Sequence, residues 1–445
     1  MTRLFKVSVL FIFTITNYVM AQNPFIRDQF SADPSARVFD DRVYVYPSHD
    51  ILAKEGKGRV GWFCMEDYHV FSSENLTDWT DHGVIVKQNE VPWVKKNSYA
   101  MWAPDCIYKN GKYYFYFPAT PADTTGKKRF TIGVAVSDNP TGPFTPQAEA
   151  IKNVRGIDPN VFIDKDGQSY LYWSQQNIYG AKLKNDMLEL AMEPKTLGEL
   201  PTKGLKEGPF MFERNGIYYL TYPHVENKIE RLEYATGDNP LGPFKFAGVI
   251  MDESPIGCWT NHHSIIQIKN QWFLFYHHND YSPKFDKARS VRIDSLFFNP
   301  DGSIKKVTPT FRGVGITDGR QNIQLDRYTQ IDDKGASIAF VDSLHTFLGW
   351  KTVLKAPGAW VKYNAVDLGK GLIKKISVRA ISNGGILQVR TDGLNGTVVA
   401  EMKIPASKDW TVTKATLLKV KSGVRNIVVV LKGSGRIEVN WISFE

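Results

Sequence analysis

The stretch Asn110-Gly111-Lys112-Tyr113-Tyr114-Phe115-Tyr116-Phe117 joins a turn dipeptide to a run of aromatic residues, which is typical of a β-hairpin. Four more turn-plus-aromatic signals begin at Asp41, Asp166, Asn215 and Asn270. The first aromatic residues of the five signals follow one another at spacings of 69, 57, 48 and 54 residues. A repeat of this length, built from turns and strands, indicates a five-bladed β-propeller rather than a helical solenoid.

Each hairpin signal follows a polar residue by about ten positions; in chain order these polar residues are Asp33, Asp105, Asp158, Glu207 and His262. A propeller arranges equivalent positions of its blades around one axis, so we expect the five side chains to converge on one pocket. The four acids lie within two residues of a proline, which fixes φ and removes a backbone donor. We therefore expect each carboxylate to be presented from a defined turn at the start of a strand.

Residues 1–21 have the features of a secretory signal peptide. Arg3 and Lys6 supply positive charge, an apolar run follows from Val7 to Ile15, and small residues end at Ala21. The apolar run is too short to cross a bilayer, although an anchored N-terminal helix is the alternative. We expect an exported chain, secreted or periplasmic, without a membrane span.

The charge and cysteine patterns exclude several classes of protein. Removing residues 1–21 lowers the formal net charge from +9 to about +7, and the remaining basic residues are scattered among acids. No basic stripe for nucleic acid is visible. Cys64, Cys106 and Cys258 are odd in number and lack CxxC spacing, so we expect buried thiols rather than a disulfide framework, with one bridge as the alternative.

The composition divides the chain into two all-β domains. Residues 23–312 hold short aromatic strands without a long helical period, and the phrases 138–144 and 238–244 repeat one turn that we assign to the same outer connection of two blades. A tether is expected near 307–319. Residues 321–445 contain fewer aromatics and about six strand-like runs, which favours a β-sandwich of the jelly-roll kind.

Several carboxylates that face one pocket repel one another when ionised, which separates their pKa values. One acid then stays protonated while another stays ionised, and glycosidic cleavage needs this pair. An inverting enzyme holds the two groups roughly 6.5–9.5 Å apart and a retaining enzyme about 5–5.5 Å, a difference that spacing along the chain does not decide. The alternative is that these acids only cap turns.

The ordered phrases around the five polar residues, together with 73–79 and 289–291, resemble glycoside hydrolase family 43. The resemblance implies a five-bladed propeller of inverting enzymes that act on arabinose- and xylose-containing plant polysaccharides. It implies Asp33 as the general base, Glu207 as the general acid and Asp158 as the residue that tunes the pKa of the acid. No cofactor is expected for the chemistry.

The same resemblance implies three further roles in the pocket, with Arg289 contacting substrate hydroxyls and Trp102 forming a sugar platform. His262 would hold a calcium ion or a water near the floor; zinc is not expected there, because a lone imidazole is a poor transition-metal site. The alternatives are a structural ion pair for Arg289, core packing for Trp102 and a buried histidine for His262. Asp105 is expected to be structural, and Asp67 to lie in a surface loop rather than in the pocket.

The C-terminal segment resembles carbohydrate-binding module family 6 through 363–369, 389–400, Trp410 and the closing 440–444. The resemblance implies a sandwich that holds sugar against Trp410. Glu438 stands where the family usually has Asn, so a sandwich that only packs against the propeller is the alternative.

The whole chain is thus expected to remove arabinose or xylose from plant cell-wall polysaccharide or oligosaccharide, most simply as an α-L-arabinofuranosidase. A β-D-xylosidase is the first alternative. The alternatives from other classes are a non-catalytic sugar-binding propeller and an adhesion scaffold.

Overall fold

The computed structural model describes residues 22–123, 130–198, 200–201, 203–370 and 373–445, so the expected signal peptide lies outside the described residues. The described part forms seven sheets and two short 3-10 helices, η1 (Gln88–Glu90) and η2 (Thr346–Leu348). None of its helices is long and apolar enough to span a membrane. The chain is therefore all-β in its described part, as expected.

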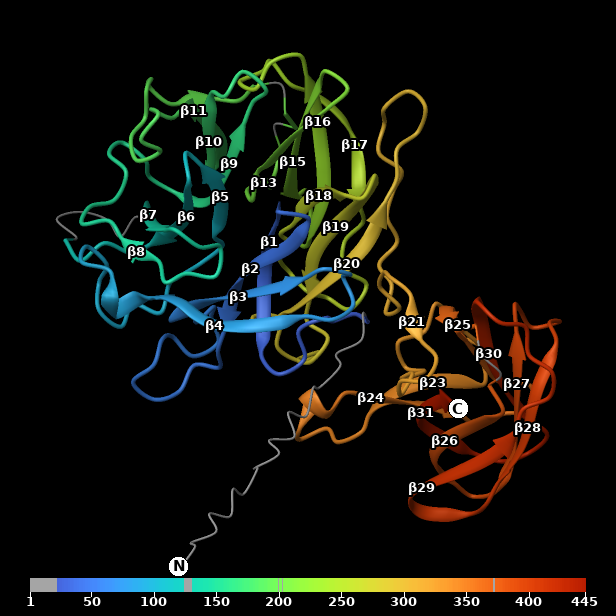
Figure 1. Ribbon diagram of the computed structural model, residues 1–445. Coiled ribbons are helices and arrows are strands. Elements are labelled where there is room, and N and C mark those ends of the chain that lie inside the picture. Colours follow the sequence, from blue (N-terminus) through green and yellow to red (C-terminus); the bar gives the residue numbers. More distant parts are fainter. Residues whose placement is uncertain (1–21, 124–129, 199, 202, 371–372) are drawn as a thin grey trace, which may run out of the picture.

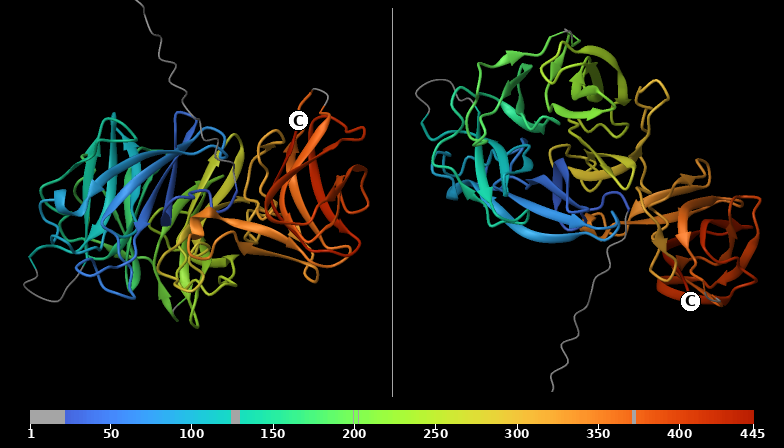
Figure 2. Two further views of the ribbon diagram at one scale, coloured as in Figure 1. Left: turned by 90° about the horizontal axis from the view of Figure 1, so that it is seen from below. Right: turned by 45° about the horizontal axis from the view of Figure 1, so that its top comes forward.

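Five antiparallel sheets form the blades of a propeller (Figures 1 and 2). Blade 1 contains β1 (Phe30–Phe39), β2 (Arg42–Asp50), β3 (Asp67–Ser73) and β4 (Thr80–Lys87). Blade 2 contains β5 (Asp105–Lys109), β6 (Lys112–Ala119), β7 (Thr131–Ser137) and β8 (Thr145–Pro146), and blade 3 contains β9 (Ile157–Ile163), β10 (Ser169–Gln175), β11 (Asn177–Lys182) and β12 (Lys195–Thr196). Blade 4 contains β13 (Leu205–Lys206), β14 (Phe210–Arg214), β15 (Ile217–Val225), β16 (Glu230–Gly237) and β17 (Lys245–Met251), and blade 5 contains β18 (Ser264–Ile268), β19 (Gln271–His278) and β20 (Ser290–Leu296).

The predicted aromatic hairpins are the turns between the first and second main strands of the blades. Asn110 and Gly111 connect β5 to β6 with φ of +52° and +79°, and Asn215 and Gly216 connect β14 to β15 with φ of +53° and +83°. Two successive residues with positive φ make the tight turn that matches the twist of the flanking strands. The repeat is confirmed, because all five signals occupy the same place in their blades.

The two similar phrases 138–144 and 238–244 are also equivalent in space. The first follows β7 and leads to β8, and the second follows β16 and leads to β17. Both are therefore the connection from the third strand to the outer strand, as the sequence predicted.

Polar contacts between the inner strands close the ring of blades. Asp105 on β5 accepts hydrogen bonds from Ser35 Oγ on β1 at 2.6 Å and from the Val161 amide on β9 at 2.7 Å. Ser264 on β18 donates to the Pro34 carbonyl on β1 at 2.5 Å, so the last blade is joined to the first. Asp105 thus links three blades, and the expected structural role is confirmed.

Two further sheets form the C-terminal sandwich, with a core of aliphatic side chains between them. One sheet contains β21 (Thr317–Asp318), β22 (Gln330–Ile331), β25 (Trp360–Asp367), β27 (Gly385–Thr391), β28 (Val398–Ile404) and β30 (Val424–Lys432). The other contains β23 (Ala336–Phe340), β24 (Trp350–Leu354), β26 (Lys375–Ser382), β29 (Ser407–Thr416) and β31 (Ile437–Phe444). β21 begins before residue 321, so the sandwich sheets extend into the segment that the sequence assigned to a tether.

The sandwich packs directly against the propeller. Arg327 is buried with its guanidinium 4.4 Å from the Trp350 ring, and Tyr281 of the propeller stacks on Trp350 at 4.9 Å. Gln22, just before the propeller, donates a 2.6 Å hydrogen bond to Tyr363 of the sandwich. The two domains therefore share an aromatic and hydrogen-bonded interface. The ribbon shows the sandwich lying beside the propeller (Figure 2).

The three cysteines are free and buried, as expected. Burial raises the pKa of the Cys64 thiol to about 11, and burial also raises the pKa values of Cys106 and Cys258. A thiol with such a raised pKa is protonated at neutral pH, and only the thiolate is a good nucleophile.

Candidate active site

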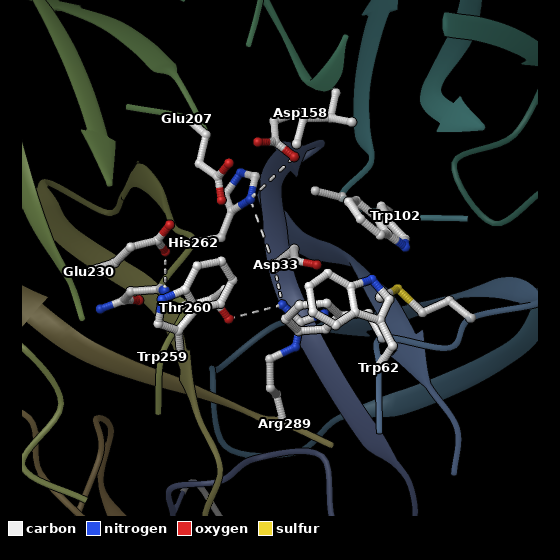
Figure 3. A pocket seen from close by; sticks show the side chains of 15 residues that line it. Asp33, Trp62, Trp102, Asp158, Glu207, Glu230, Trp259, Thr260, His262 and Arg289 are labelled. Atoms are coloured by element: carbon white, nitrogen blue, oxygen red, sulfur yellow. Dashed lines mark hydrogen bonds and ion pairs between the residues drawn. The ribbon is translucent and has the colours of Figure 1, made fainter. Parts of the chain in front are cut away.

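One cavity of about 120 Å³ brings together all the pocket residues singled out in the propeller sequence (Figure 3). It is lined by Asp33, Trp102, Asp158, Glu207, His262 and Arg289. It is also lined by residues that sequence reasoning did not select, among them Trp62, Phe63, Glu230, Trp259 and Thr260. Four of the five polar positions expected to converge, Asp33, Asp158, Glu207 and His262, therefore meet in one pocket, whereas Asp105 does not line it.

Two of the acids lie in β-bulges of inner strands. Asp33 has φ of +47° where the pairing of β1 with β2 shifts between Ala32 and Ser35. Asp158 has φ of +57°, and the pairing of β9 with β10 shifts across the same part of the strand. A bulge interrupts the alternation of side chains between the two faces of the sheet and so redirects one of them. A proline can follow in the bulge because no backbone N–H is needed there for pairing with the next strand. The expectation of a turn before the strand is corrected here, since both acids lie within strands.

Glu207 reaches the pocket from the loop between β13 and β14. The next residue, Gly208, has φ of +53°, and a Cβ atom there would lie 3.0 Å from Pro223 and 3.2 Å from the His262 ring. Glycine is therefore required both by the backbone and by the space. The Gly208 amide donates a 2.9 Å hydrogen bond to Asp158 Oδ2, so the loop that carries Glu207 is tied to Asp158.

The Asp33 carboxylate is held by donors and positive charge. Arg289 Nη1 donates to Oδ1 at 2.8 Å, and Ser48 Oγ donates to Oδ2 at 2.6 Å. Burial alone would raise the pKa of Asp33, but Arg289, His277 and His262 outweigh burial and lower this pKa to about 2. Asp33 is therefore a carboxylate at every pH at which the protein would work.

Arg289 is itself fixed by a second carboxylate. Its Nε and Nη2 donate to Asp50 at 2.8 and 2.9 Å, which is a bidentate pair. Burial opposes the charge of Arg289, but Asp33 and Asp50 raise its pKa, so the guanidinium stays protonated. These contacts direct Arg289 toward Asp33 and favour a positioning role beside the expected contact with substrate hydroxyls.

Asp33 is surrounded by donors and positive charge, whereas Glu207 lies close to other carboxyl groups. Burial, the charge of Glu207 and the charge of Asp33 raise the pKa of Asp158, although His262 opposes them. Burial, with Asp33, raises the pKa of Glu207, and the neighbouring Glu230 opposes this shift. Burial and Glu207 raise the pKa of Glu230 far above its ordinary range. Protonated carboxyl groups are therefore favoured on this side of the pocket.

His262 lies between the two groups of acids. Its Nδ1 is 3.8 Å from Asp33 Oδ1 and 4.0 Å from Asp158 Oδ1. Calcium takes six to eight oxygen ligands at about 2.3–2.6 Å, whereas this arrangement offers one nitrogen and two carboxylates, one of which already binds Arg289 and Ser48. These side chains alone do not form a calcium cage, and the calcium expected near His262 stays a prediction.

Aromatic side chains form one wall of the pocket. Phe63 lies 5.9 Å from the Trp102 ring and 6.2 Å from the Trp259 ring, and the Arg289 guanidinium lies 4.9 Å from Phe63. Trp62, more than a third exposed, stands at the mouth (Figure 3). Such a wall suits the apolar faces of a sugar ring, while the acids supply the polar contacts.

Two candidates lie elsewhere. Asp67 begins β3 and contacts His49, so it lies in a strand and outside this pocket, whereas the sequence favoured a surface loop. Trp410 lies on β29 of the sandwich, where the Arg379 guanidinium is 5.0 Å from its ring. Trp410 is half-buried, and its role in binding sugar stays a prediction.

Glu230 and His277 are two ionisable residues of the site that sequence reasoning missed. Glu230 begins β16, a third strand, whereas the repeat drew attention to first strands. Its Oε2 accepts from the Asn261 amide at 2.5 Å, which fixes the loop beside His262. His277 is the last residue but one of β19, and its Nδ1 accepts from the Asp33 amide at 3.1 Å. The adjacent pair His277-His278 was the visible signal in the sequence.

Comparison with known proteins agrees with this geometry. The model for glycosyl hydrolases family 43 matches residues 21–304, and the model for carbohydrate binding module family 6 matches residues 349–445. A xylosidase/arabinosidase of Humicola insolens is 37% identical over 64% of this chain and 99% of its own length. An arabinoxylan arabinofuranohydrolase of Paenibacillus polymyxa is 28% identical over 93% of this chain and 72% of its own length.

A solved β-xylosidase/α-arabinofuranosidase from a compost microbial metagenome is also similar, with xylotriose bound in a calcium-free form. It is 36% identical, with a TM-score of 0.57, and the match covers 64% of this chain and 97% of that one. The residue pattern, the five blades and the matched models lead to one assignment. The chain belongs to glycosyl hydrolases family 43, is a glycosidase, and carries a C-terminal domain of carbohydrate binding module family 6.

Proposed function

We propose that this protein is an exported, inverting glycosidase that removes single terminal xylosyl or arabinofuranosyl units from hemicellulose oligosaccharides. The observation that carries the proposal is the contrast inside one pocket between an ionised Asp33 and the protonation-prone Glu207. Cleavage with inversion needs one carboxylate that activates water and one carboxylic acid that protonates the leaving oxygen.

The proton transfers follow from these two states. Asp33 accepts a proton from a water molecule as the water oxygen bonds to the anomeric carbon. Glu207 donates its proton to the glycosidic oxygen as the bond between that oxygen and the anomeric carbon breaks. The products are a free sugar of inverted configuration and a shortened chain with a new hydroxyl, and solvent exchange restores both carboxyl groups.

Neighbouring groups position the pair. Arg289, Ser48 and His277 hold Asp33 in one orientation, so the carboxylate needs little rearrangement during attack. Glu207 raises the pKa of Asp158, and the interaction between two coupled acids is mutual. We propose that Asp158 ionises first and that its charge then raises the pKa of Glu207. Glu230 donates a hydrogen bond to Glu207 from its own protonated carboxyl and so adjusts this pKa in the opposite direction.

The size of the cavity supports removal of single sugars. A cavity needs about 10–15 Å³ to hold one buried water molecule. The cavity of about 120 Å³ therefore has room for roughly the atoms of one pentose ring. The remainder of the oligosaccharide would leave past the half-exposed Trp62. A pocket of this size favours exo action over cleavage within a long chain.

The choice between the two sugars rests on relatives. Of three that match mainly the propeller at 35–37% identity, two are named xylosidase/arabinosidase and one is named β-xylosidase. Two relatives whose match covers more than nine-tenths of this chain, at 27–28% identity, are named arabinoxylan arabinofuranohydrolases. We therefore propose activity on both sugars, with α-L-arabinofuranosidase activity retained as the first expectation and β-D-xylosidase activity as the second.

The proposal also gives a function to each end of the chain. Residues 1–21 direct export, and the sandwich around Trp410 holds the polymer near the propeller. Export would bring the enzyme to plant cell-wall fragments outside the cytoplasm.

Product analysis tests the proposal. Purified protein is incubated with nitrophenyl α-L-arabinofuranoside, nitrophenyl β-D-xyloside, xylotriose and arabinoxylan, and proton NMR follows the first anomer released. Release of single pentoses with inverted configuration supports the proposal. No release from any of the four substrates, or a first product of retained configuration, would contradict it.

A further inference from the structure

A group of two histidines and one aspartate lies on blade 1, outside the catalytic cavity. His49 on β2 and Asp67 and His69 on β3 each place one potential ligand atom within 4.8 Å of the other two. The His49 and His69 rings are 5.0 Å apart, and His49 Nδ1 is 2.6 Å from Asp67 Oδ1. Two strands of one rigid sheet therefore converge on three donor atoms.

A fourth residue fixes one of the imidazoles from behind. Both carboxylate oxygens of Asp81 lie 3.1 Å from His69 Nδ1, so Nδ1 carries the proton and Nε2 keeps its lone pair. A carboxylate that orients a histidine in this way is the usual second layer of a metal site, because it sets the tautomer and strengthens the ligand. Nothing in the proposed glycosidic mechanism uses this arrangement.

The donor set selects the class of ion. Imidazole nitrogens with one carboxylate suit first-row divalent transition ions, whereas calcium and magnesium prefer oxygen alone. Zinc–ligand bonds of about 2.0–2.1 Å place tetrahedral ligand atoms roughly 3.4 Å apart. The widest separation, at most 4.8 Å, would shorten by up to about 1.4 Å, and the 2.6 Å between His49 Nδ1 and Asp67 Oδ1 would widen. The side chains of His49, Asp67 and His69 are 14–19% exposed, which leaves a path for the ion and a position for water.

The location separates this group from the active site while keeping it close in the chain. Side chains alternate along a strand, so His49 faces away from its neighbours Ser48 and Asp50 on β2. Ser48 donates to Asp33, and Asp50 holds Arg289. An ion bound by His49 and β3 would clamp the strand that supports the catalytic base from its other face.

We propose that His49, Asp67 and His69 form a binding site for a divalent transition ion of the zinc class, with Asp81 as the positioning residue behind His69. The ion replaces the proton shared by His49 and Asp67 and cross-links β2 to β3. The site is distinct from the His262 position, and its occupancy does not depend on the proposed glycosidase activity.

Zinc binding to the full-length mature protein is measured by calorimetry in excess calcium, which occupies oxygen-rich positions. We expect one zinc ion per chain with micromolar affinity, and a rise of a few degrees in Tm. Zinc-edge X-ray absorption then counts two imidazoles around the ion. Stoichiometric binding that shows one imidazole or none, or no binding below millimolar zinc, would overturn the proposal.

Variants locate the ion. His49→Gln and His69→Gln are each expected to abolish the stoichiometric site, and Asp81→Asn to weaken it by about 10–100-fold, the range for loss of an orienting carboxylate. His345→Ala is the matched control. His345 also pairs with an aspartate, Asp342, at 2.8 Å, but it does not belong to a group of three potential metal ligands in the described part of the chain. Unchanged affinity in both His49→Gln and His69→Gln, or loss of binding in His345→Ala, would contradict the assignment.

If one of the glutamine variants fails to fold, two independent measurements still test the zinc site. Asp81→Asn tests the affinity in a protein that keeps all three ligands, and the absorption spectrum of the unaltered protein counts the histidines directly. Neither readout requires turnover, so loss of glycosidase activity and loss of zinc binding remain distinguishable.

Discussion

The two sides of the catalytic pocket differ in the charge around their carboxyl groups. Asp33 lies against Arg289, His277 and His262, and its pKa falls to about 2 in spite of burial. Glu207, Asp158 and Glu230 lie against one another, and their pKa values rise. Burial pushes every carboxyl group toward the neutral form, so the neighbours alone decide which one stays charged.

This difference explains how one pocket can hold a base and an acid at the same pH. Arg289 is charged because Asp50 takes up two of its donors, and the same guanidinium then holds Asp33. Around Glu207, burial and Asp33 outweigh the effect of Arg289, and around Asp158 burial and the neighbouring carboxylates outweigh His262. The chemistry therefore depends on an asymmetric supply of positive charge across one cavity.

The largest effect is expected from Asp33→Asn. The amide cannot accept a proton from water, so kcat on xylotriose and on nitrophenyl arabinofuranoside should fall by about 10³–10⁴-fold, near the upper range for loss of a general base. Thermal unfolding should show a folded protein, and Asp28→Asn, an exposed aspartate just before β1, is the control. Residual activity above a tenth of normal would remove Asp33 from the role of base.

Asp158→Asn should lower kcat by about 10²-fold and change the pH profile. On the proposed order of ionisation, charged Asp158 raises the pKa at which Glu207 loses its proton, so removing this charge lowers that pKa. Activity should therefore be lost at lower pH on the basic side of the profile, while the acidic side stays in place. Asp164→Asn, at the start of the turn after β9, should leave the basic limb where it is; a basic limb that moves upward in Asp158→Asn would contradict the account.

Glu230→Leu should shift the basic limb of the pH profile to higher pH, with a fall in kcat of about tenfold or less. The protonated Glu230 donates to Glu207 and stabilises its ionised form, so losing this donor raises the pKa of Glu207. Glu230→Gln keeps a donor of similar shape and is the matched control, with a limb near the unaltered position. Equal profiles for Glu230→Leu and Glu230→Gln would show that the hydrogen bond to Glu207 does not tune it.

The smallest effect is expected from Trp410→Ala, far from the pocket. Rates on nitrophenyl substrates should be unchanged, while KM on arabinoxylan should rise a few-fold, since stacking on one aromatic ring contributes about 1 kcal/mol. Val412→Ala on the same strand is half-exposed and serves as the control. Identical KM values on arabinoxylan for all three proteins would support the alternative of a sandwich that only packs against the propeller.

The repeat made the fold and most of the pocket predictable. Equivalent positions of the repeat hold Asp33, Asp158, Glu207 and His262. A propeller places equivalent positions of its blades around one axis, so these four residues meet in one pocket. The hairpin turns were predictable because Asn110-Gly111 needs two positive φ values. Asp105 occupies the same position in its repeat but points into a junction between blades, in agreement with the structural role expected for it.

The residues that sequence reasoning missed act through contacts between distant strands. Glu230 meets Glu207 only after β16 folds beside the loop before β14, and Asp50 meets Arg289 across 239 positions of sequence. The bulges at Asp33 and Asp158 were also missed, because proline in a turn and proline in a bulge look alike in the sequence. His49, Asp67 and His69 remained separate residues until the pairing of β2 with β3 brought them together.

The central claim is that Glu207 gives a proton to the leaving group while Asp33 activates water. Glu207→Gln and Asp33→Asn are compared on an unactivated substrate, xylotriose, and on a dinitrophenyl pentoside whose leaving group needs no proton. Glu207→Gln should lose about 10³-fold on xylotriose but less than about tenfold on the dinitrophenyl substrate, whereas Asp33→Asn should be impaired on both. Equal losses of Glu207→Gln on the two substrates, or recovery of Asp33→Asn on the activated one, would contradict the assignment of acid and base.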